Sequence, residues 1–484
     1  MPRRAVSALL ATTAALVGLG LPAVSPVADP AAAEGQRPAP RSAVPFPTRT
    51  AADRDGNTRL ADDRGRILQL RGANLGKFDD ITEQDVADLG AAGLSLLRLP
   101  IQWSLVEPTE GSYDAAYLQH VQDVLDWAHE AGLLVLVDWH QDVFGPAFGF
   151  DGAPAWATRT DGLEFEPVDG NWFNNYFHPA VQAAFSHLWN DADLQEAQVA
   201  AWTHVAAQLA GSPALLGYDL FNEPMWTSGT FETQELPAMY RRVIAGIRSV
   251  DARSWLWIEP TVLVGEGLPV RLPGIEDPRA GADRIGFAPH AYSSAVEDGG
   301  DWDATSIWVS AYEAQITQYP RRHHLPVIVG EWGPIAANAD FPGNVELVEQ
   351  QAASFPRFAS GWAIWYGCRS ATGGGYCIFT DDAGHLDPGR GAAWRPYALA
   401  LAGRTVRETA GAHRFRLSYR PRPGTTTVIV PSGFATRPDV AVTTGTRAAP
   451  ARVRMSAPTA TGARTITVRP RHRPQGTWTL TISG

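Results

Sequence analysis

Two glutamates carry the strongest chemical signal in this sequence. Glu223 lies in Leu220-Phe221-Asn222-Glu223-Pro224, and Glu331 lies in Val329-Gly330-Glu331-Trp332-Gly333. Both segments close a short apolar run, so both carboxylates are expected at strand ends. Two such groups can cleave a glycosidic bond if one protonates the leaving oxygen while the other lies beside the anomeric carbon. One Asn-Glu-Pro segment alone would fit a strand end with a buried ion pair, but two such carboxylates make that alternative weak.

The elements that would position these residues form a repeating pattern. Eight short, nearly continuous apolar runs are typical of strands that are buried on both faces. They are Ile67–Leu75, Ser95–Ile101, Leu133–His140, Leu215–Pro224, Trp255–Pro260, Arg284–Tyr292, Pro326–Gly333 and Gly361–Gly367. Amphipathic stretches such as Asp114–Ala131 and Leu236–Val250 lie between them and predict helices. This alternation predicts a (β/α)8 TIM barrel.

Polar or aromatic residues collect toward the carboxyl ends of these eight runs. They are Asn74, Arg98, His140, Asn222 with Glu223, Glu259, His290, Glu331 and Trp365. Barrel enzymes carry their catalytic groups at the carboxyl ends of the strands. The pattern therefore favours an active site at this face.

At these positions the chain resembles the retaining β-glycosidases of glycoside hydrolase family 5. The resemblance covers roughly residues 55–402. The positions that match the family are Arg98, His140, Asn222, Glu223, His290, Tyr292, Glu331 and Trp365, in the family's order along the chain.

The resemblance implies a role for each of these residues. Glu223 would be the general acid and then the general base, and Glu331 the nucleophile. Arg98 and Tyr292 would hold the nucleophile, and Asn222 would hydrogen-bond the sugar 2-hydroxyl. His140 and His290 would position the sugar and the carboxylates, and Trp365 would form an apolar sugar platform. Glu259 matches no catalytic position, so we expect it to support the site or to contact the sugar.

A narrower resemblance points to endoglycoceramidases and related glycosylceramide-cleaving enzymes. It rests on Val137–Phe144, which contains His140-Gln141-Asp142, on Gly152–Ala157, and on Arg395-Pro396-Tyr397 followed by Phe415–Tyr419. It implies that Asp142 and Lys77 contact the first sugar. Lys77 is the only lysine of the chain, and the alternative for it is an ordinary surface position.

The segment 144–189 is long for a barrel loop and rich in aromatic residues. Long loops in compact domains are often functional. Its aromatic side chains are expected either to stack on sugar rings and line an acyl-chain channel, or to form a small core beneath the loop.

The ends of the chain predict further parts. Arg3 and Arg4 precede the apolar run Ala5–Leu21, which is typical of a secretory signal over residues 1–33, with a membrane anchor as the alternative. Residues 34–54 are proline-rich and predict a linker, which leaves 55–402 as the catalytic domain. Residues 403–484 alternate apolar and polar positions between turn signals and predict an antiparallel β-sandwich.

Charge and cysteine content narrow the class of protein. The net charge is −11, although residues 403–484 hold 14 arginines against Glu408 and Asp439. The overall charge argues against a nucleic-acid partner, whereas the arginine-rich part would suit either an anionic surface or the acidic barrel. Cys368 and Cys377 are the two cysteines, and they predict a disulfide in an oxidising compartment.

These observations predict a secreted, retaining β-glycosidase that cleaves the bond between glycan and ceramide in glycosphingolipids. Its partners would be that substrate or another β-glycoside, and a lipid surface at the periphery, and we expect a monomer. No dinucleotide, phosphate-loop or metal-ligand motif occurs in the sequence, so we expect no cofactor and no metal. One alternative is a family member that acts on a polysaccharide or another β-glucoside. The other is a glycan- or lipid-binding protein without catalysis.

Overall fold

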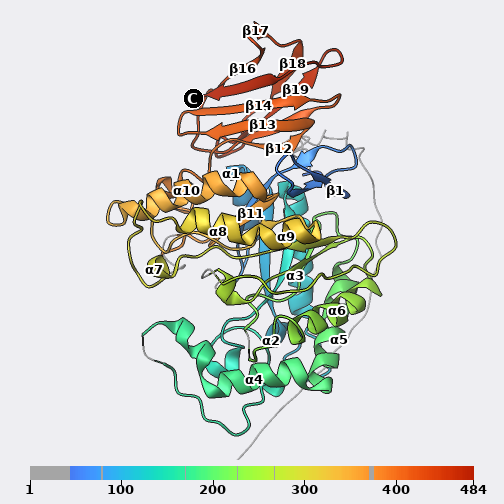
Figure 1. The fold of residues 1–484 in the computed structure, drawn as a ribbon. Helices are drawn as coiled ribbons and strands as arrows, with labels where there is room; N and C mark the ends of the chain where they lie inside the picture. The colour runs from blue at the N-terminus through green and yellow to red at the C-terminus, as the bar shows by residue number, and fades with distance from the viewer. Residues whose placement is uncertain (1–43, 78–79, 169, 226, 266–267, 370–374) are drawn as a thin grey trace, which may run out of the picture. The chain divides into compact units, whose positions relative to one another are not determined.

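The computed structural model describes residues 44–484, except 78–79, 169, 226, 266–267 and 370–374. The predicted signal segment 1–33 lies outside the described residues. The predicted barrel is confirmed: eight parallel strands pair in the order β10-β11-β4-β5-β6-β7-β8-β9 (Figure 1). They are β4 Leu70–Asn74, β5 Leu96–Gln102, β6 Leu134–His140, β7 Leu215–Asp219, β8 Trp255–Ile258, β9 Ile285–Phe287, β10 Ile328–Val329 and β11 Gly361–Ile364. Parallel bridges Phe287–Val327 and Ala291–Trp332 connect the two ends of this order.

Helices surround the strands, and α8 and α10 pack side by side (Figure 1). The helices are α1 Glu83–Ala92, α2 Trp103–Val106, α3 Ala115–Ala131, α4 Pro179–Asn190, α5 Ala192–Leu209, α6 Glu235–Arg248, α7 Ser294–Glu297, α8 Trp308–Ile316, α9 Gln318–His323 and α10 Pro342–Phe358. Short 3-10 turns are η1 Pro146–Phe148, η2 Ala155–Ala157, η3 Trp172–Phe177, η4 Val262–Val264 and η5 Pro388–Arg390.

Helix α3 shows why the predicted helices form. The Asp114 carboxylate accepts hydrogen bonds from the Ala116 and Tyr117 amides, and Gly132 ends the helix in a left-handed conformation. The apolar positions Leu118 and Leu125 lie on one face and are buried.

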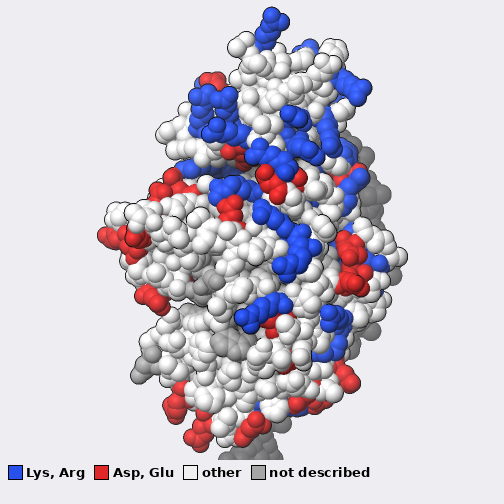
Figure 2. All heavy atoms as spheres, viewed as in Figure 1, with Lys and Arg blue, Asp and Glu red and all other residues white. Residues whose placement is uncertain are grey.

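Two antiparallel sheets contain the strands that follow the barrel in the chain, and the first of them also contains β1–β3, which precede it. One has the order β1-β2-β3-β12-β15-β19-β18 and the other β13-β14-β20-β16-β17. Their strands are β1 Arg49–Ala52, β2 Thr58–Ala61, β3 Ile67–Leu68, β12 Tyr397–Leu401, β13 Gly403–Ala410, β14 Arg414–Pro421, β15 Thr426–Val430, β16 Asp439–Thr444, β17 Arg447–Ala448, β18 Ala451–Met455, β19 Arg464–Pro470 and β20 Trp478–Ser483. Arginines gather on these strands, as Figure 2 shows.

The N-terminal strands of this first sheet differ from the sequence interpretation. The apolar run Ile67–Leu75 holds two strands, because Ile67–Leu68 pairs with β12 and Leu70–Asn74 belongs to the barrel. Strand β1 lies within the range predicted as linker, since its exposed residues carry no apolar pattern. The first sheet therefore joins segments from both sides of the barrel in the chain.

Strand β12 lies between two apolar cores. Tyr397 and Leu399 pack with inward-facing barrel residues such as Trp255. Ala398 and Leu401 pack into the core between the C-terminal sheets. Among the described residues, no helix has the length and apolar character to cross a bilayer.

Candidate functional site

Arg98 is the centre of the polar cluster at the carboxyl ends of the strands. It lies within β5, and its side chain is fully buried. Its guanidinium contacts the side chains of Asn74, Asp138, Asp219, Asn222, Glu259 and Glu331 at 2.7–3.0 Å. Burial alone would lower the pKa of Arg98, but these carboxylates raise it well above the ordinary value. The cluster therefore holds one fixed positive charge among several negative ones.

Glu331 follows β10 and is held at both oxygens. Oε1 accepts from Arg98 Nη1 at 2.7 Å, and Oε2 accepts from the Tyr292 hydroxyl at 2.9 Å. Burial would raise the pKa of Glu331, but the positive charges of His290 and Arg98 hold it below the ordinary value. This carboxylate is ionised at neutral pH and has a fixed orientation.

Glu223 has the opposite electrostatic environment. Burial raises its pKa to about 7, although a hydrogen bond from His290 opposes the shift. Its Oε1 lies 2.8 Å from His290 Nδ1. Its backbone has a φ of 45°, in the left-handed region, and its amide donates to Glu259 Oε2 at 2.9 Å. Gln141 Nε2 donates to the Glu223 carbonyl at 3.0 Å, so both peptide groups of this residue are held.

The two glutamates are close enough to act on one bond. Glu223, His290 and Glu331 each place one side-chain atom within 4.8 Å of the others. This separation suits direct attack by one carboxylate on the anomeric carbon. The pair therefore combines a carboxyl group that holds a proton near neutral pH with one that does not.

Two triads among the described residues have the spacing of metal ligands. They are Glu223–His290–Glu331 and Asp138–Asp219–Glu259. In the second triad, the Arg98 guanidinium already lies against all three carboxylates. In the first, Glu259 and Glu331 raise the pKa of His290 well above its ordinary value although burial lowers it, so a charged imidazolium lies beside the two glutamates. Both triads thus contain the positive charge that a cation would supply.

A second group lies beside the pair and contains Lys77, His140, Asp142 and Trp365. The Lys77 ammonium forms an ion pair with Asp142, lies 3.9 Å from Asp151, and sits 5.3 Å from the centre of the Trp365 ring. The His140 ring stacks against Trp365 at 5.8 Å, and its Nδ1 lies 2.7 Å from Asp138. These residues hold charged and apolar surfaces next to each other, as sugar binding requires.

Most of the predicted site residues share one pocket. A cavity of about 650 Å³ is lined by Lys77, His140, Asp142, Glu223, His290, Tyr292, Glu331 and Trp365. Two predicted residues lie behind it. Arg98 is buried under the glutamates, and Asn222 uses Oδ1 to accept from Arg98 and Nδ2 to donate to the Gln141 carbonyl at 3.1 Å. Asn222 is buried and does not line the cavity, so its contact with the sugar 2-hydroxyl stays a prediction.

The aromatic side chains of segment 144–189 fall into the two expected groups, one in a core beneath the loop and one at the cavity. Side chains that form a core beneath the loop are Phe144, Phe148, Tyr176, Phe185 and Trp189. Side chains that line the cavity are Phe150, Trp172, Phe173 and Phe177. Trp172 and Phe177 are also 47% and 46% exposed, so the cavity has an apolar wall at its rim.

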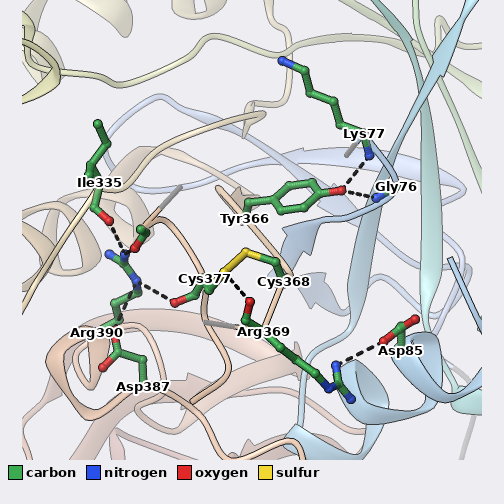
Figure 3. Close-up of a disulfide and its surroundings, with 11 residues drawn as sticks. Gly76, Lys77, Asp85, Ile335, Tyr366, Cys368, Arg369, Cys377, Asp387 and Arg390 are labelled. Carbon is green, nitrogen blue, oxygen red and sulfur yellow. Dashed lines mark hydrogen bonds and ion pairs between the residues drawn. A yellow bond between two sulfur atoms is a disulfide. The ribbon is translucent and has the colours of Figure 1, made fainter. Parts of the chain in front are cut away.

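The sequence interpretation missed several residues that support the site. Asp138 and Asp219 lie inside apolar strands and contact Arg98. A buried charge in a strand is itself a signal, because a charge needs a partner there. Tyr366 was also missed, since a tyrosine after an apolar strand looks like an ordinary core residue. The predicted disulfide Cys368–Cys377 is confirmed (Figure 3).

The site and barrel define a glycoside hydrolase, and the comparisons agree. Residues 61–367 match the cellulase family, glycosyl hydrolase family 5. The chain therefore belongs to glycoside hydrolase family 5.

Three relatives place it more closely. It is 26% identical to endoglycoceramidase I of Rhodococcus hoagii over 428 residues, which cover 81% of this chain and 82% of that protein. It is 30% identical to endo-glycoceramidase II from a Rhodococcus species in its ganglioside GM3 complex, with a TM-score of 0.76 over 88% of this chain and 99% of that one. An endogalactoceramidase structure, at 23% identity and a TM-score of 0.68 over 90% of this chain and all of that one, shares the fold.

Proposed function

We propose that this protein is an endoglycoceramidase that hydrolyses the β-linkage between glycan and ceramide in glycosphingolipids, with retention of configuration. The observation that carries the proposal is the carboxylate pair, in which burial raises the pKa of Glu223 to about 7 while nearby positive charges lower that of Glu331. A retaining glycosidase needs this difference between two carboxyl groups a few ångströms apart.

In the first step Glu331 attacks the anomeric carbon. The bond to the ceramide oxygen breaks, and Glu223 delivers its proton to that oxygen, so ceramide leaves as an alcohol. The glycan remains as an ester on Glu331. In the second step Glu223, now ionised, takes a proton from water, the water oxygen attacks the anomeric carbon, and the carboxylate of Glu331 is released.

The remaining predicted residues would hold the first sugar. Lys77, Asp142 and His140 offer polar contacts on one side, and Trp365 offers an apolar ring face. The aromatic rim supports a lipid rather than a polysaccharide as the other half of the substrate. A ceramide gains from burial against an apolar wall, whereas a glucan chain needs an open polar groove with exposed tryptophan, and here Phe150, Phe173 and Phe177 line the cavity beside Trp172.

The test compares lactosylceramide with a soluble β-glucan, each incubated with the wild type and with Glu331→Gln. We expect intact lactose and ceramide from the wild type alone, with the variant reduced by about 10⁴-fold or more because the nucleophile is lost. Cleavage of the glucan without release of ceramide would overturn the substrate and keep the chemistry. Full activity of Glu331→Gln would overturn the mechanism.

Retention is tested separately by following the released sugar with proton NMR. We expect the β-anomer first and the α-anomer only after mutarotation, because two displacements restore the starting configuration. Initial release of the α-anomer would show a single displacement by water and contradict a covalent intermediate on Glu331.

We further propose that the protein is exported and works at a lipid surface. The Cys368–Cys377 disulfide supports export, because disulfides persist in oxidising compartments. The exposed Trp172 and Phe177 at the cavity rim support contact with lipid. Recovery of the chain, shortened at its N-terminus, from the culture medium would test export.

A further inference from the structure

Tyr366 contacts the backbone that carries Lys77 and not the cavity. It lies two residues after β11, next to Trp365, and its side chain is fully buried. Its hydroxyl oxygen accepts hydrogen bonds from the amides of Gly76 and Lys77, each at 2.6 Å (Figure 3). A hydroxyl oxygen has two acceptor sites, and the two consecutive amides use both.

The turn at Gly76 presents both amides to this one oxygen. Gly76 has a φ of 106°, in the left-handed region that favours glycine. A Cβ atom there would lie 2.5 Å from Ile81 Cδ1, so both the conformation and the space require glycine. The turn has little freedom, and Tyr366 fixes its position relative to β11.

Two consecutive residues, Trp365 and Tyr366, therefore contact the side-chain and backbone ends of Lys77. The Tyr366 hydroxyl holds its amide, while the Trp365 ring lies beneath its ammonium. The ammonium in turn pairs with Asp142, which faces the cavity. A change in the position of Tyr366 would shift the Lys77–Asp142 pair.

The backbone of Tyr366 is held by hydrogen bonds beside the disulfide. The Tyr366 amide donates to the Tyr376 carbonyl at 3.3 Å, and the Tyr366 carbonyl accepts from the Ile378 amide at 3.1 Å. The Cys368–Cys377 disulfide, drawn in Figure 3, joins these two backbone segments close in sequence to the residues that form these hydrogen bonds.

Arg369 and Arg390 connect the backbone around the disulfide to other parts of the barrel domain. Arg369 pairs with Asp85 and Asp88 on α1. Arg390 donates to the carbonyls of Pro334 and Ile335, which follow Glu331 in the chain.

We propose that Tyr366 is a positioning residue: held by the Cys368–Cys377 disulfide, its hydroxyl fixes the Gly76–Lys77 backbone and thereby the Lys77–Asp142 pair at the first sugar. This inference rests on the proposed role of Lys77 and Asp142 in binding the sugar. It predicts that Tyr366 acts on catalysis only through Lys77.

A double-mutant cycle tests this with Tyr366→Phe, Lys77→Met and the double variant, on whichever β-glycoside the wild type cleaves. We expect Tyr366→Phe to lower kcat/KM about tenfold, mainly through KM, because two amides lose their acceptor and the sugar contact loosens. The double variant should match Lys77→Met within about twofold. Losses that multiply in the double variant would overturn the proposal and indicate a general structural role.

Tyr218→Phe is the matched control. Tyr218 is also fully buried, and its hydroxyl donates to Asp251 at 3.1 Å, away from the residues that line the cavity. Its kcat/KM should stay within about twofold of the wild type, since its hydroxyl bonds to Asp251 and to no residue that lines the cavity, so its loss affects stability more than chemistry.

Amide hydrogen exchange tests the same inference without any activity. Exchange at Gly76 and Lys77 should speed up about tenfold or more in Tyr366→Phe and in Cys368→Ser/Cys377→Ser, but not in Tyr218→Phe. Unchanged exchange in Tyr366→Phe would overturn the inference. If the wild type cleaves another β-glycoside but no glycosphingolipid, only the proposed substrate fails. If Lys77→Met keeps full activity while exchange rises as expected, the sugar contact fails and the positioning role with it.

Discussion

Arg98 holds several buried carboxylates close together, because its positive charge offsets their mutual repulsion. It lies against Glu331, Glu259, Asp138 and Asp219 with no exposure to solvent. Removing it would take away the positive charge that these buried carboxylates share, at a cost of several kcal/mol. Glu223 makes no contact with it, which is why burial dominates there and the pKa rises.

The pH dependence follows from the two glutamates. Above about 7 the acid Glu223 loses its proton, so kcat/KM on a glycosphingolipid should fall about tenfold per pH unit. Because the pKa of Glu331 lies below its ordinary value of 4.5, the acid limb should appear only below that pH. A dinitrophenyl β-lactoside, whose leaving group needs no proton, should lack the limb near 7. The same alkaline limb with both substrates would contradict the assignment of Glu223 as the acid.

Glu259→Gln should move both limbs of the profile. Glu259 is the first of the charges that raise the pKa of His290, but Glu331 and Glu223 raise it as well, so His290 keeps its positive charge in the variant. With one negative charge removed beside both catalytic glutamates, the pKa of Glu223 and that of Glu331 should fall, and both limbs should shift to lower pH. The loss in kcat/KM should be on the order of tenfold, because Arg98 also loses a charged partner. A uniform loss with no shift of the limbs would indicate that Glu259 only supports the fold.

At the residue scale, the sequence predicted the groups that face the cavity better than those behind it. Glu223 and Glu331 could be predicted because each ends an apolar run in a position where a carboxylate has a chemical use. Asp138 and Asp219 escaped because one buried charge in a strand shows its purpose only once the partner in space is known. The raised pKa of Glu223 also depends on burial by distant segments, which no local pattern reports.

At the scale of elements, changes in the aromatic segment 144–189 should affect recognition of the lipid but not of the sugar. The double variant Trp172→Ala/Phe177→Ala should lose about tenfold or more in kcat/KM on lactosylceramide, because it removes apolar surface from the cavity rim. Activity on a soluble aryl β-lactoside should stay within about twofold, since no sugar contact changes.

Leu163→Ala provides the control for that pair. Leu163 belongs to the same segment and is 45% exposed, but it does not line the cavity. Its activity on both substrates should equal that of the wild type. Equal losses on both substrates in the aromatic variant would place Trp172 and Phe177 at the sugar instead.

The strands could be predicted from the sequence where both of their faces are buried. Seven of the eight barrel strands fall within predicted runs and β5 extends one residue past its run, because a strand between two layers must be apolar throughout. Strands β13 and β18 lack this apolar signal, since few of their residues are buried and several are arginines. The break at Gln69 was missed, because an apolar run does not reveal that its halves belong to different sheets.

At the scale of the whole molecule, the shared strand β12 predicts how the described parts unfold. One face of β12 packs with the barrel core and the other with the core between the C-terminal sheets. We expect one cooperative transition in calorimetry, with activity and secondary structure lost together. Two separated transitions, the first leaving activity intact, would show that the C-terminal sheets unfold on their own.

The order of strands in the first sheet has a consequence for synthesis. Strand β3 pairs with β12, which the ribosome adds about 330 residues later, a delay on the order of tens of seconds at roughly 5–20 residues per second. Until then β1–β3 form a sheet edge without its partner, and the base of the barrel lacks the strand that covers it. The first sheet therefore cannot form completely until the C-terminal third of the chain has been synthesised. Chaperones that bind exposed strand edges would bind the chain at its N-terminal end.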